Sequence, residues 1–367
     1  MHKYTYTEIE EIWNDDTKIS VMENMWLKHL EWMHSNGFDE ALQRGEYTPP
    51  NQSSQHEVID ALRIYVGKTG YVNAHAGLTS SDIVDNVRLW QCAMSINVTQ
   101  KLVSLLIDHI SKVQPSNTRC VGYTHWRPAA HTTMGTRFEA LVEPLIEMKD
   151  KMSSFIPLPM KRVGGATGTR SAMAILCGKM PIGDPNLSDM LAPSYWDSTL
   201  QSGYHLNELE CVDMLCMIAA QAHKISQDFR FLIHTGEITL ERDTAYRGSS
   251  SMPNKINPIE FERVCSLLRL VPSYYRAVWD AMAFNGLERT LDTSAILRVA
   301  LPDAFNIVCY CINELIGGMS RVCIDEHKCA KILAENKEIA YSEDNMAHEI
   351  ANGKSRMEVY EKQQQKQ

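Results

Sequence analysis

One long run of helical periodicity constrains the fold of this chain more than any other feature. From Ser80 onward, apolar residues recur every three or four positions, and no proline or glycine interrupts them before Pro115. The run consists of Ile83, Val87, Trp90, Met94, Val98, Leu102 and Leu105. This spacing predicts one helix of about thirty residues, roughly 50 Å long at about 1.5 Å per residue. A helix of that length is unusual in a compact monomer.

Comparable helical segments follow at about 136–156, 205–237, 258–284 and 298–321. Their broad faces are rich in Leu, Met, Val and Cys, as expected of helices that are covered on several sides. Strand signals are poor, because no hairpin dipeptide lies between alternating apolar runs. We therefore predict an all-α fold, an elongated bundle of long helices that buries further apolar surface between subunits.

The chain divides into three predicted domains. Residues 1–78 read as an N-terminal domain of short helices, and residues 79–304 as the central long-helix bundle. Residues 305–367 read as a short C-terminal helical domain, whose polar end is expected to fray.

Composition excludes several classes of protein. With 367 residues, 44% hydrophobic and 22% charged, the chain is an ordinary globular protein, and its net charge of −9 argues against nonspecific nucleic-acid binding. Ten scattered cysteines without a C-x-x-C motif predict reduced core thiols in a cytoplasmic protein, and neither a metal nor another cofactor is expected. We find no signal peptide and no apolar run of the length that a membrane span needs, so we expect a soluble protein.

A Ser-rich loop carries the chemistry. It reads Gly-Ser-Ser-Ser-Met-Pro-Asn-Lys-Ile-Asn-Pro over residues 248–258, and a helix follows at once. Lys255 and Asn257, beside free backbone N–H groups at a helix N-terminus, could hold a carboxylate and the extra charge that it gains when the neighbouring carbon is deprotonated. A serine of the loop could be the base. An ordinary Ser-rich surface loop is the alternative, and the order of residues over eleven positions argues against it.

The loop resembles the G-S-S-x-M-P-x-K-x-N-P signature of the fumarase/aspartase superfamily of lyases. Further matches favour the adenylosuccinate lyase family, and they lie at residues 75–82, 124–129, 132–135, 165–169 and 288–292. The resemblance implies the long-helix bundle of this superfamily and a homotetramer in which each active site takes residues from three subunits. Compared with typical members, the C-terminal domain is cut short.

The same resemblance implies catalytic roles for named residues. Ser249 matches the base, His125 the acid, and Glu262 the carboxylate that orients the acid. His56 occupies the place of an active-site histidine, followed by Glu57 where aspartate is usual; a helix-capping or surface histidine is the alternative reading. The implied catalytic set is His56, His125, Ser249, Lys255, Asn257 and Glu262.

The implied substrate is a nucleoside monophosphate bearing a succinyl group. Arg289, Ser294 and Arg298 match phosphate-binding positions, with surface ion pairs as the alternative for the two arginines. Thr79 and Ser80 match the succinyl carboxylate site, although hydroxyls at a helix start also cap N–H groups. The implied substrate-binding set is Lys3, Tyr4, His75, Thr79, Ser80, Gln201, Ser250, Arg289, Ser294 and Arg298.

Departures from the family pattern touch ligand recognition. Arg127 stands where the family has glutamine, next to the proposed acid, and Lys3 replaces an arginine. A second glutamine is displaced, so that either Ser198 or Gln201 takes its place.

The resemblance implies cleavage of adenylosuccinate to AMP and fumarate, and of the succinylated aminoimidazole carboxamide ribotide of purine biosynthesis. A 2-amino or deoxy variant of adenylosuccinate, or argininosuccinate, is the alternative substrate. A catalytically inactive structural or binding homologue is the alternative of another class.

Overall fold

The computed structural model describes residues 3–113, 117–193, 198–242, 251–252 and 254–364. It divides into two compact units. Unit 1 comprises Met1–Val103, Met148–Ala220 and Leu267–Ile312, and unit 2 comprises Ser104–Glu147, Gln221–Ser266 and Asn313–Gln367. The chain passes between them within helices, and each unit is described by itself. The three predicted domains stay a prediction.

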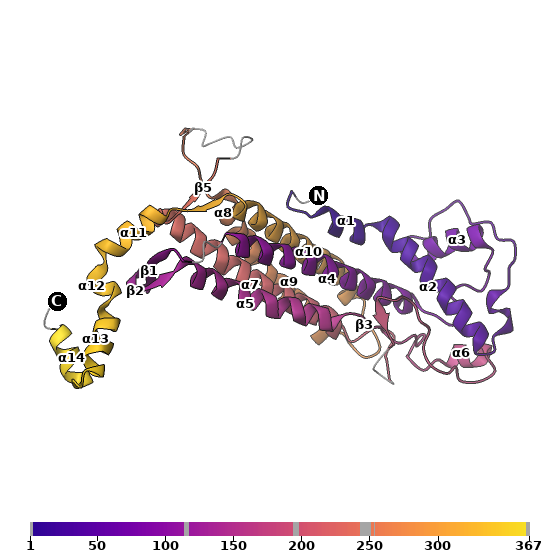
Figure 1. The fold of residues 1–367 in the computed structure, drawn as a ribbon. Helices are drawn as coiled ribbons and strands as arrows, with labels where there is room; N and C mark the ends of the chain where they lie inside the picture. The colour runs from indigo at the N-terminus through magenta and orange to yellow at the C-terminus, as the bar shows by residue number, and fades with distance from the viewer. Residues whose placement is uncertain (1–2, 114–116, 194–197, 243–250, 253, 365–367) are drawn as a thin grey trace. The chain divides into compact units, whose positions relative to one another are not determined.

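The predicted long helices are present, and the all-α fold class is confirmed (Figure 1). They are α4 (Ser80–Lys112), α5 (Met134–Phe155), α7 (Leu206–Thr235) and α10 (Asp292–Met319). Burial explains their broad apolar faces: in α4, Ile83, Val87 and Val103 have no exposed surface. Apolar burial of this extent is the main stabilising term of such a bundle.

The segment predicted at 258–284 is not one continuous helix. It consists of α8 (Ile259–Leu267), the 3-10 turn η2 (Leu268–Leu270) and α9 (Val271–Ala283). Pro272, in the first turn of α9, is the physical reason. A proline inside a helix has no N–H to donate, and its ring clashes with the carbonyl four residues earlier, here that of Leu268.

In unit 1, short N-terminal elements accompany the helices of the bundle. They are α1 (Thr7–Trp13), α2 (Asp15–Ser35), the 3-10 turn η1 (Asp39–Leu42) and α3 (Glu57–Thr69). The helix α6 (Ser171–Leu176) and the parallel pair β3 (Leu158–Pro159) and β4 (Leu191–Ala192) complete the unit. The first third of α4 is tied to its neighbours by polar contacts, since Arg88 Nε donates to Glu208 Oε1 of α7 at 2.9 Å and Asn86 Nδ2 donates to the Lys161 carbonyl at 2.9 Å.

Unit 2 contains strands that the sequence did not predict. β1 (Arg119–Thr124) and β2 (Arg127–Thr133) form an antiparallel hairpin, and β5 (Ile238–Leu240) pairs with β6 (Val322–Ile324). The C-terminal helices are α11 (Glu326–Glu335), α12 (Lys337–Ala340), α13 (Ser342–Ala351) and α14 (Arg356–Gln364). In the core, the rings of Phe138, Phe229 and Phe261 stack in sequence with centroids 5.4 and 5.6 Å apart.

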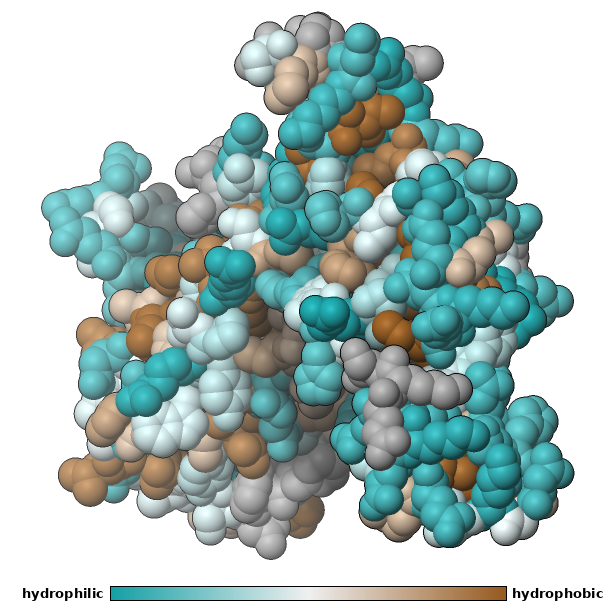
Figure 2. All heavy atoms as spheres, turned by 90° about the vertical axis from the view of Figure 1, so that its left-hand side faces the viewer, coloured by the Kyte–Doolittle hydropathy of each residue, from teal (hydrophilic) through white to brown (hydrophobic). Residues whose placement is uncertain are grey.

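One helix corrects an expectation about apolar runs. Within the part of the chain that the structure describes, α10 is long and apolar enough to cross a membrane by length and composition. Most of its apolar window is buried inside the protein, which is the pattern of a core helix. The cysteines are free, and most are buried. On the face shown in Figure 2, hydrophilic residues prevail and apolar residues form scattered patches between them.

Candidate functional site

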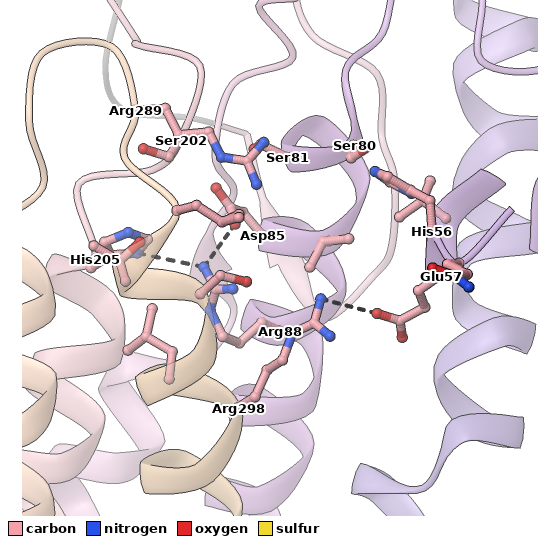
Figure 3. Close-up of a pocket in the computed structure, with 17 residues that line it drawn as sticks. His56, Glu57, Ser80, Ser81, Asp85, Arg88, Ser202, His205, Arg289 and Arg298 are labelled. Carbon is pink, nitrogen blue, oxygen red and sulfur yellow. Dashed lines mark hydrogen bonds and ion pairs between the residues drawn. The ribbon is translucent and has the colours of Figure 1, made fainter.

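A cavity in unit 1, lined mostly by polar residues, brings together several of the predicted site residues (Figure 3). Its volume is about 250 Å³. Five predicted residues line it, namely His56, Ser80, Arg289, Ser294 and Arg298. Other polar residues of the wall are Gln55, Glu57, Ser81, Asp85, Arg88, Ser202, His205 and Thr293.

Helix ends position most of these side chains. His56 is the residue immediately before α3, and Ser80 is the first residue of α4. Ser294 lies in the first turn of α10, and Arg298 lies one turn further on. Because positions four apart share a face of a helix, the two residues lie on the same side of α10. Arg289 lies in the loop that precedes α10. Residues far apart in the sequence therefore meet because helix ends meet.

Among the described residues, the side-chain partner of Arg289 is an amide and not a carboxylate. Its Nη1 donates to Gln201 Oε1 at 3.2 Å, and Gln201 Nε2 donates to the Ala166 carbonyl at 2.9 Å. Gln201 therefore links the arginine to the glycine-rich loop at 164–169. Within the described ranges, Ser198 contributes its carbonyl, which accepts a bond from the Tyr204 hydroxyl at 3.4 Å.

Asp82 organises the start of α4, a role that the sequence reading did not assign although this residue lies in a matched motif. Its carboxylate accepts bonds from Thr79 N at 2.8 Å, Gly164 N at 2.9 Å and Gly165 N at 3.1 Å. The ammonium group of Lys161 pairs with the same carboxylate, and both side chains are almost completely buried. Asp82 thus joins the predicted succinyl site at Thr79 to the glycine-rich loop.

His75 is held in one tautomer. Trp26 Nε1 donates to His75 Nδ1 at 3.0 Å, so in the neutral ring the proton is on Nε2. Burial lowers the pKa of His75 to about 4, so the ring is neutral near pH 7. His75 can therefore donate a hydrogen bond from Nε2.

A buried charge network adjoins the cavity, whose wall includes Asp85, Arg88 and His205, and the sequence reading missed it. Arg88 bonds Asp85 Oδ1 at 2.8 Å as well as Glu208, and His205 Nδ1 lies 3.2 Å from Glu208 Oε1. Burial works to raise the pKa of Glu208, but Arg88 and His205 lower it to about 2. Only the spacing of Asp85 and Arg88, three apart on one helix, signalled a part of this network.

The predicted acid, His125, lies in unit 2 at the tip of the β1–β2 hairpin. Thr124 pairs with Arg127, and His125 and Trp126 between them have φ of 52° and 60°. Positive φ at both central residues is the geometry of a type I′ hairpin turn. Its usual Asn-Gly signal is absent, so the sequence did not reveal the hairpin.

A second cavity, of about 290 Å³, adjoins His125 in unit 2. Tyr123, Trp126, Arg137, Lys224, Asp228, Phe231 and Leu232 also line it. The Tyr123 hydroxyl donates to Glu237 Oε2 at 2.8 Å. Burial and this carboxylate raise the pKa of Tyr123, which stays a proton donor near neutral pH.

The remaining predicted residues are spread along unit 2 and the N-terminus. Lys255 is exposed and Asn257 half-buried, just before α8. Glu262 Oε1 lies 3.9 Å from Arg230 Nη2, and its role toward His125 stays a prediction. Ser249 and Ser250 lie outside the described residues.

At the other end of the chain, in unit 1, the Tyr4 ring packs against Tyr310 with centroids 5.4 Å apart, and the Lys3 ammonium lies 6.0 Å from the Tyr4 ring. The described members of the predicted set therefore fall into two groups, one in each unit. In the described part of the chain, no three His, Cys, Asp or Glu side chains gather as they would around a metal ion.

Comparisons with known proteins support the all-α fold and show which enzymes the chain is similar to. The chain is 26% identical over 340 residues to the adenylosuccinate lyase of Schistosoma mansoni, covering 85% of this chain and 70% of that one. It is 25% identical over 393 residues to the adenylosuccinate lyase of Archaeoglobus fulgidus, covering 98% and 84%. The 3-carboxy-cis,cis-muconate lactonizing enzyme of Pseudomonas putida has the same fold, with a TM-score of 0.80, 19% identity, and coverage of 99% of this chain and 85% of that one.

A family profile described as "Lyase" matches residues 40–272. This span is more than half of the 367 residues. As its resemblance to the fumarase/aspartase superfamily predicts, the chain therefore belongs to this lyase family.

Proposed function

We propose that this protein is a carbon–nitrogen lyase that releases fumarate from adenylosuccinate and leaves AMP. One observation carries the proposal: Arg289 lines the unit 1 cavity, and among the described residues its guanidinium has an amide partner and no carboxylate. Its charge is therefore available to an anion such as a nucleotide phosphate. The adenylosuccinate lyases to which the chain is similar support this substrate.

The proposed reaction is a β-elimination. A base removes the proton from the carbon next to a succinyl carboxylate, which becomes doubly charged, and the C–N bond then breaks as an acid protonates the leaving nitrogen. Ser249 is the proposed base and His125 the proposed acid. Lys255 and Asn257 stabilise the charged carboxylate, and Glu262 orients the acid.

The unit 1 residues bind the rest of the substrate in this proposal. Arg289, Ser294 and Arg298 take the phosphate, while His75, Thr79 and Ser80 take the succinyl group. His56 lines the same cavity as the three proposed phosphate-binding residues, and it completes the proposed catalytic set. Lys3 and Tyr4 contact the nucleotide, with Gln201 and Ser250 as further substrate contacts.

The proposed assembly is a homotetramer with shared active sites. Large apolar side chains are exposed on α9 and on the loop that precedes α10, and Phe284, Leu287 and Leu291 are 66, 86 and 71% exposed. An exposed apolar surface of this kind favours burial against another chain. We propose a cytoplasmic location on the strength of the free cysteines.

Fumarate release tests the function. Purified protein is mixed separately with adenylosuccinate, its 2-amino and deoxy analogues, the succinylated carboxamide ribotide and argininosuccinate. We expect the highest kcat/KM with adenylosuccinate, and a lower value with the ribotide. Fumarate from argininosuccinate alone, or from none of these compounds, would overturn the proposal.

Substitutions test the roles. Ser249→Ala and His125→Ala should each lower kcat at least about a hundredfold, the usual scale for loss of an acid or base, while circular dichroism shows an intact fold. Lys255→Ala should lower kcat comparably through lost carboxylate stabilisation. Near-normal turnover in any of these variants would remove that residue from its role, and a Lys255→Ala variant that only weakens nucleotide binding would reverse the proposed substrate orientation.

A further inference from the structure

Glu57 has two cationic partners, one for each carboxylate oxygen. Arg298 Nη2 lies 3.0 Å from Glu57 Oε2, and the Lys18 ammonium contacts Oε1. Figure 3 marks the pair of Arg298 and Glu57 with a dashed line. The Arg298 side chain is 49% exposed, Glu57 31% and Lys18 only 15%. The more accessible of the two cations is therefore the one that lines the unit 1 cavity with His56 and Arg289.

The triad of Lys18, Glu57 and Arg298 borders two cavities of unit 1. Glu57, Arg88 and Arg298 line the site cavity of about 250 Å³ and also a neighbouring cavity of about 570 Å³. Lys18 lines only the neighbouring one. Arg298 can therefore be approached by a ligand from the site side, while Glu57 keeps Lys18 on the other side.

The charges oppose a simple phosphate-binding role for Arg298. In the free protein its guanidinium is already paired with Glu57, so an incoming phosphate must compete with that carboxylate. Leaving a half-buried carboxylate without a partner is costly, but Lys18 remains to pair with it. Burial works to raise the pKa of Glu57, but Lys18 and Arg298 lower it overall, so Glu57 is ionised at neutral pH.

We propose that Glu57 and Lys18 form a charge-exchange pair that sets the affinity and selectivity of the site for a phosphorylated ligand. When the ligand binds, the Arg298 guanidinium leaves Glu57 and pairs with the phosphate. Lys18 is then the remaining cationic partner of Glu57. A ligand without a phosphate cannot displace Glu57 and gains nothing from Arg298. This inference rests on the proposed function, because it takes a nucleotide as the ligand.

The two residues should act in opposite directions. Glu57→Gln removes the competitor for Arg298, so AMP should bind at least about threefold more tightly. Lys18→Met makes Arg298 the one remaining cationic partner of Glu57, which then holds Arg298 more strongly. AMP should therefore bind at least about threefold more weakly. In the Glu57→Gln background, Lys18→Met should change the affinity less than about twofold, because the coupling between the two has been removed. Glu57→Asp, which keeps the charge on a shorter side chain, should fall between the wild type and Glu57→Gln.

Isothermal titration calorimetry with AMP, and with adenosine as the phosphate-free probe, measures these effects. The adenosine affinity should stay unchanged in every variant. Glu23→Gln and Lys68→Met serve as matched controls, since this pair of unit 1, 2.9 Å apart, lines neither cavity. Thermal melts confirm that each variant is folded.

The inference falls if Glu57→Gln weakens AMP binding, if both single variants shift the affinity in the same direction, or if adenosine shifts as much as AMP. It also falls if the wild-type protein binds neither AMP nor inorganic phosphate. The assay needs no turnover, so its result is separate from the proposed function. Opposite shifts in a protein that releases no fumarate would support the exchange and overturn the lyase activity, whereas fumarate release without the shifts would do the reverse.

Discussion

At the scale of the residue, Asp82 is the clearest structural requirement of the site. The Asp82 side chain is 0% exposed and that of Lys161 is 1% exposed. The Asp82 carboxylate also accepts hydrogen bonds from two backbone N–H groups of the glycine-rich loop. Asp82→Asn should lower the free energy of unfolding by about 3–5 kcal/mol, because it leaves a buried ammonium without its counter-charge. Urea denaturation measures this loss.

A double variant separates charge from shape. Asp82→Asn combined with Lys161→Met should be less destabilised than the sum of the two single variants, because no buried charge is left unpaired. A loss below about 1 kcal/mol for Asp82→Asn alone would mean that the ion pair contributes little to the fold.

His29 should make stability depend on pH. It has no exposed surface, and burial lowers its pKa to about 4, whereas an unfolded histidine titrates near 6.5. The unfolded chain therefore binds more protons between these values, so the stabilisation is complete above about pH 6.5 and is lost as the pH falls toward 4. Between pH 7 and pH 5, the wild type should lose about 2 kcal/mol more of its unfolding free energy than His29→Gln does.

Urea titrations of both proteins at the two pH values provide the measurement. His34→Gln is the control, because it removes an exposed imidazole from the same helix α2. Equal losses in the wild type and in His29→Gln would show that His29 is not buried in its neutral form.

At the scale of the element, the glycine-rich loop at 164–169 depends on close backbone approach. Gly168 has φ of +78°, and a Cβ built there would lie 1.7 Å from the Thr199 carbonyl oxygen. Gly168→Ala should therefore displace the segment that carries Gln201 and weaken its link to Arg289. We expect a loss of at least about 2 kcal/mol in unfolding free energy, together with weaker AMP binding.

Gly178→Ala is a matched control. Gly178 has φ of +67°, but nothing lies within 4 Å of its added Cβ, so only backbone strain is introduced. Its cost should be no more than about 1 kcal/mol, with unchanged AMP binding. The two variants could instead lose the same stability in thermal melts and the same AMP affinity in calorimetry. In that case glycine would be required at position 168 because of its positive φ alone, and not because of the close backbone approach.

At the scale of the whole molecule, shared active sites make a prediction about mixed subunits. Inactive Ser249→Ala and inactive His125→Ala proteins should recover part of the fumarate release after mixing under conditions that allow subunit exchange. A hybrid tetramer combines an intact serine from one chain with an intact histidine from another. Each variant incubated alone under the same conditions is the control.

The shared-site proposal would fail in two cases. A wild-type protein that is monomeric by sedimentation but fully active needs no second chain. Variants that demonstrably exchange subunits and yet recover no activity would place Ser249 and His125 of one site on the same chain.

The sequence by itself determined the helices, because helical periodicity is a local property. The start of α4 at Ser80 and its uninterrupted length followed from apolar spacing and from the absence of proline and glycine. The same reasoning extended the segment at 258–284 too far, since it gave no weight to Pro272. The loop motif and the other matched segments were sufficient to identify the family, but the roles of Ser249, His125 and the other site residues stay predictions.

Only the tertiary structure decided which charges meet. Glu57 pairs with Arg298 and Lys18, and Asp82 with Lys161, across long stretches of sequence that carry no local signal of contact. The hairpin at His125 was hidden for a related reason, because left-handed turn conformations at His and Trp are imposed by strand pairing and not favoured by the residues themselves. Local patterns set the elements, whereas the partners of each side chain depend on how helix ends pack together, and packing depends on the whole chain at once.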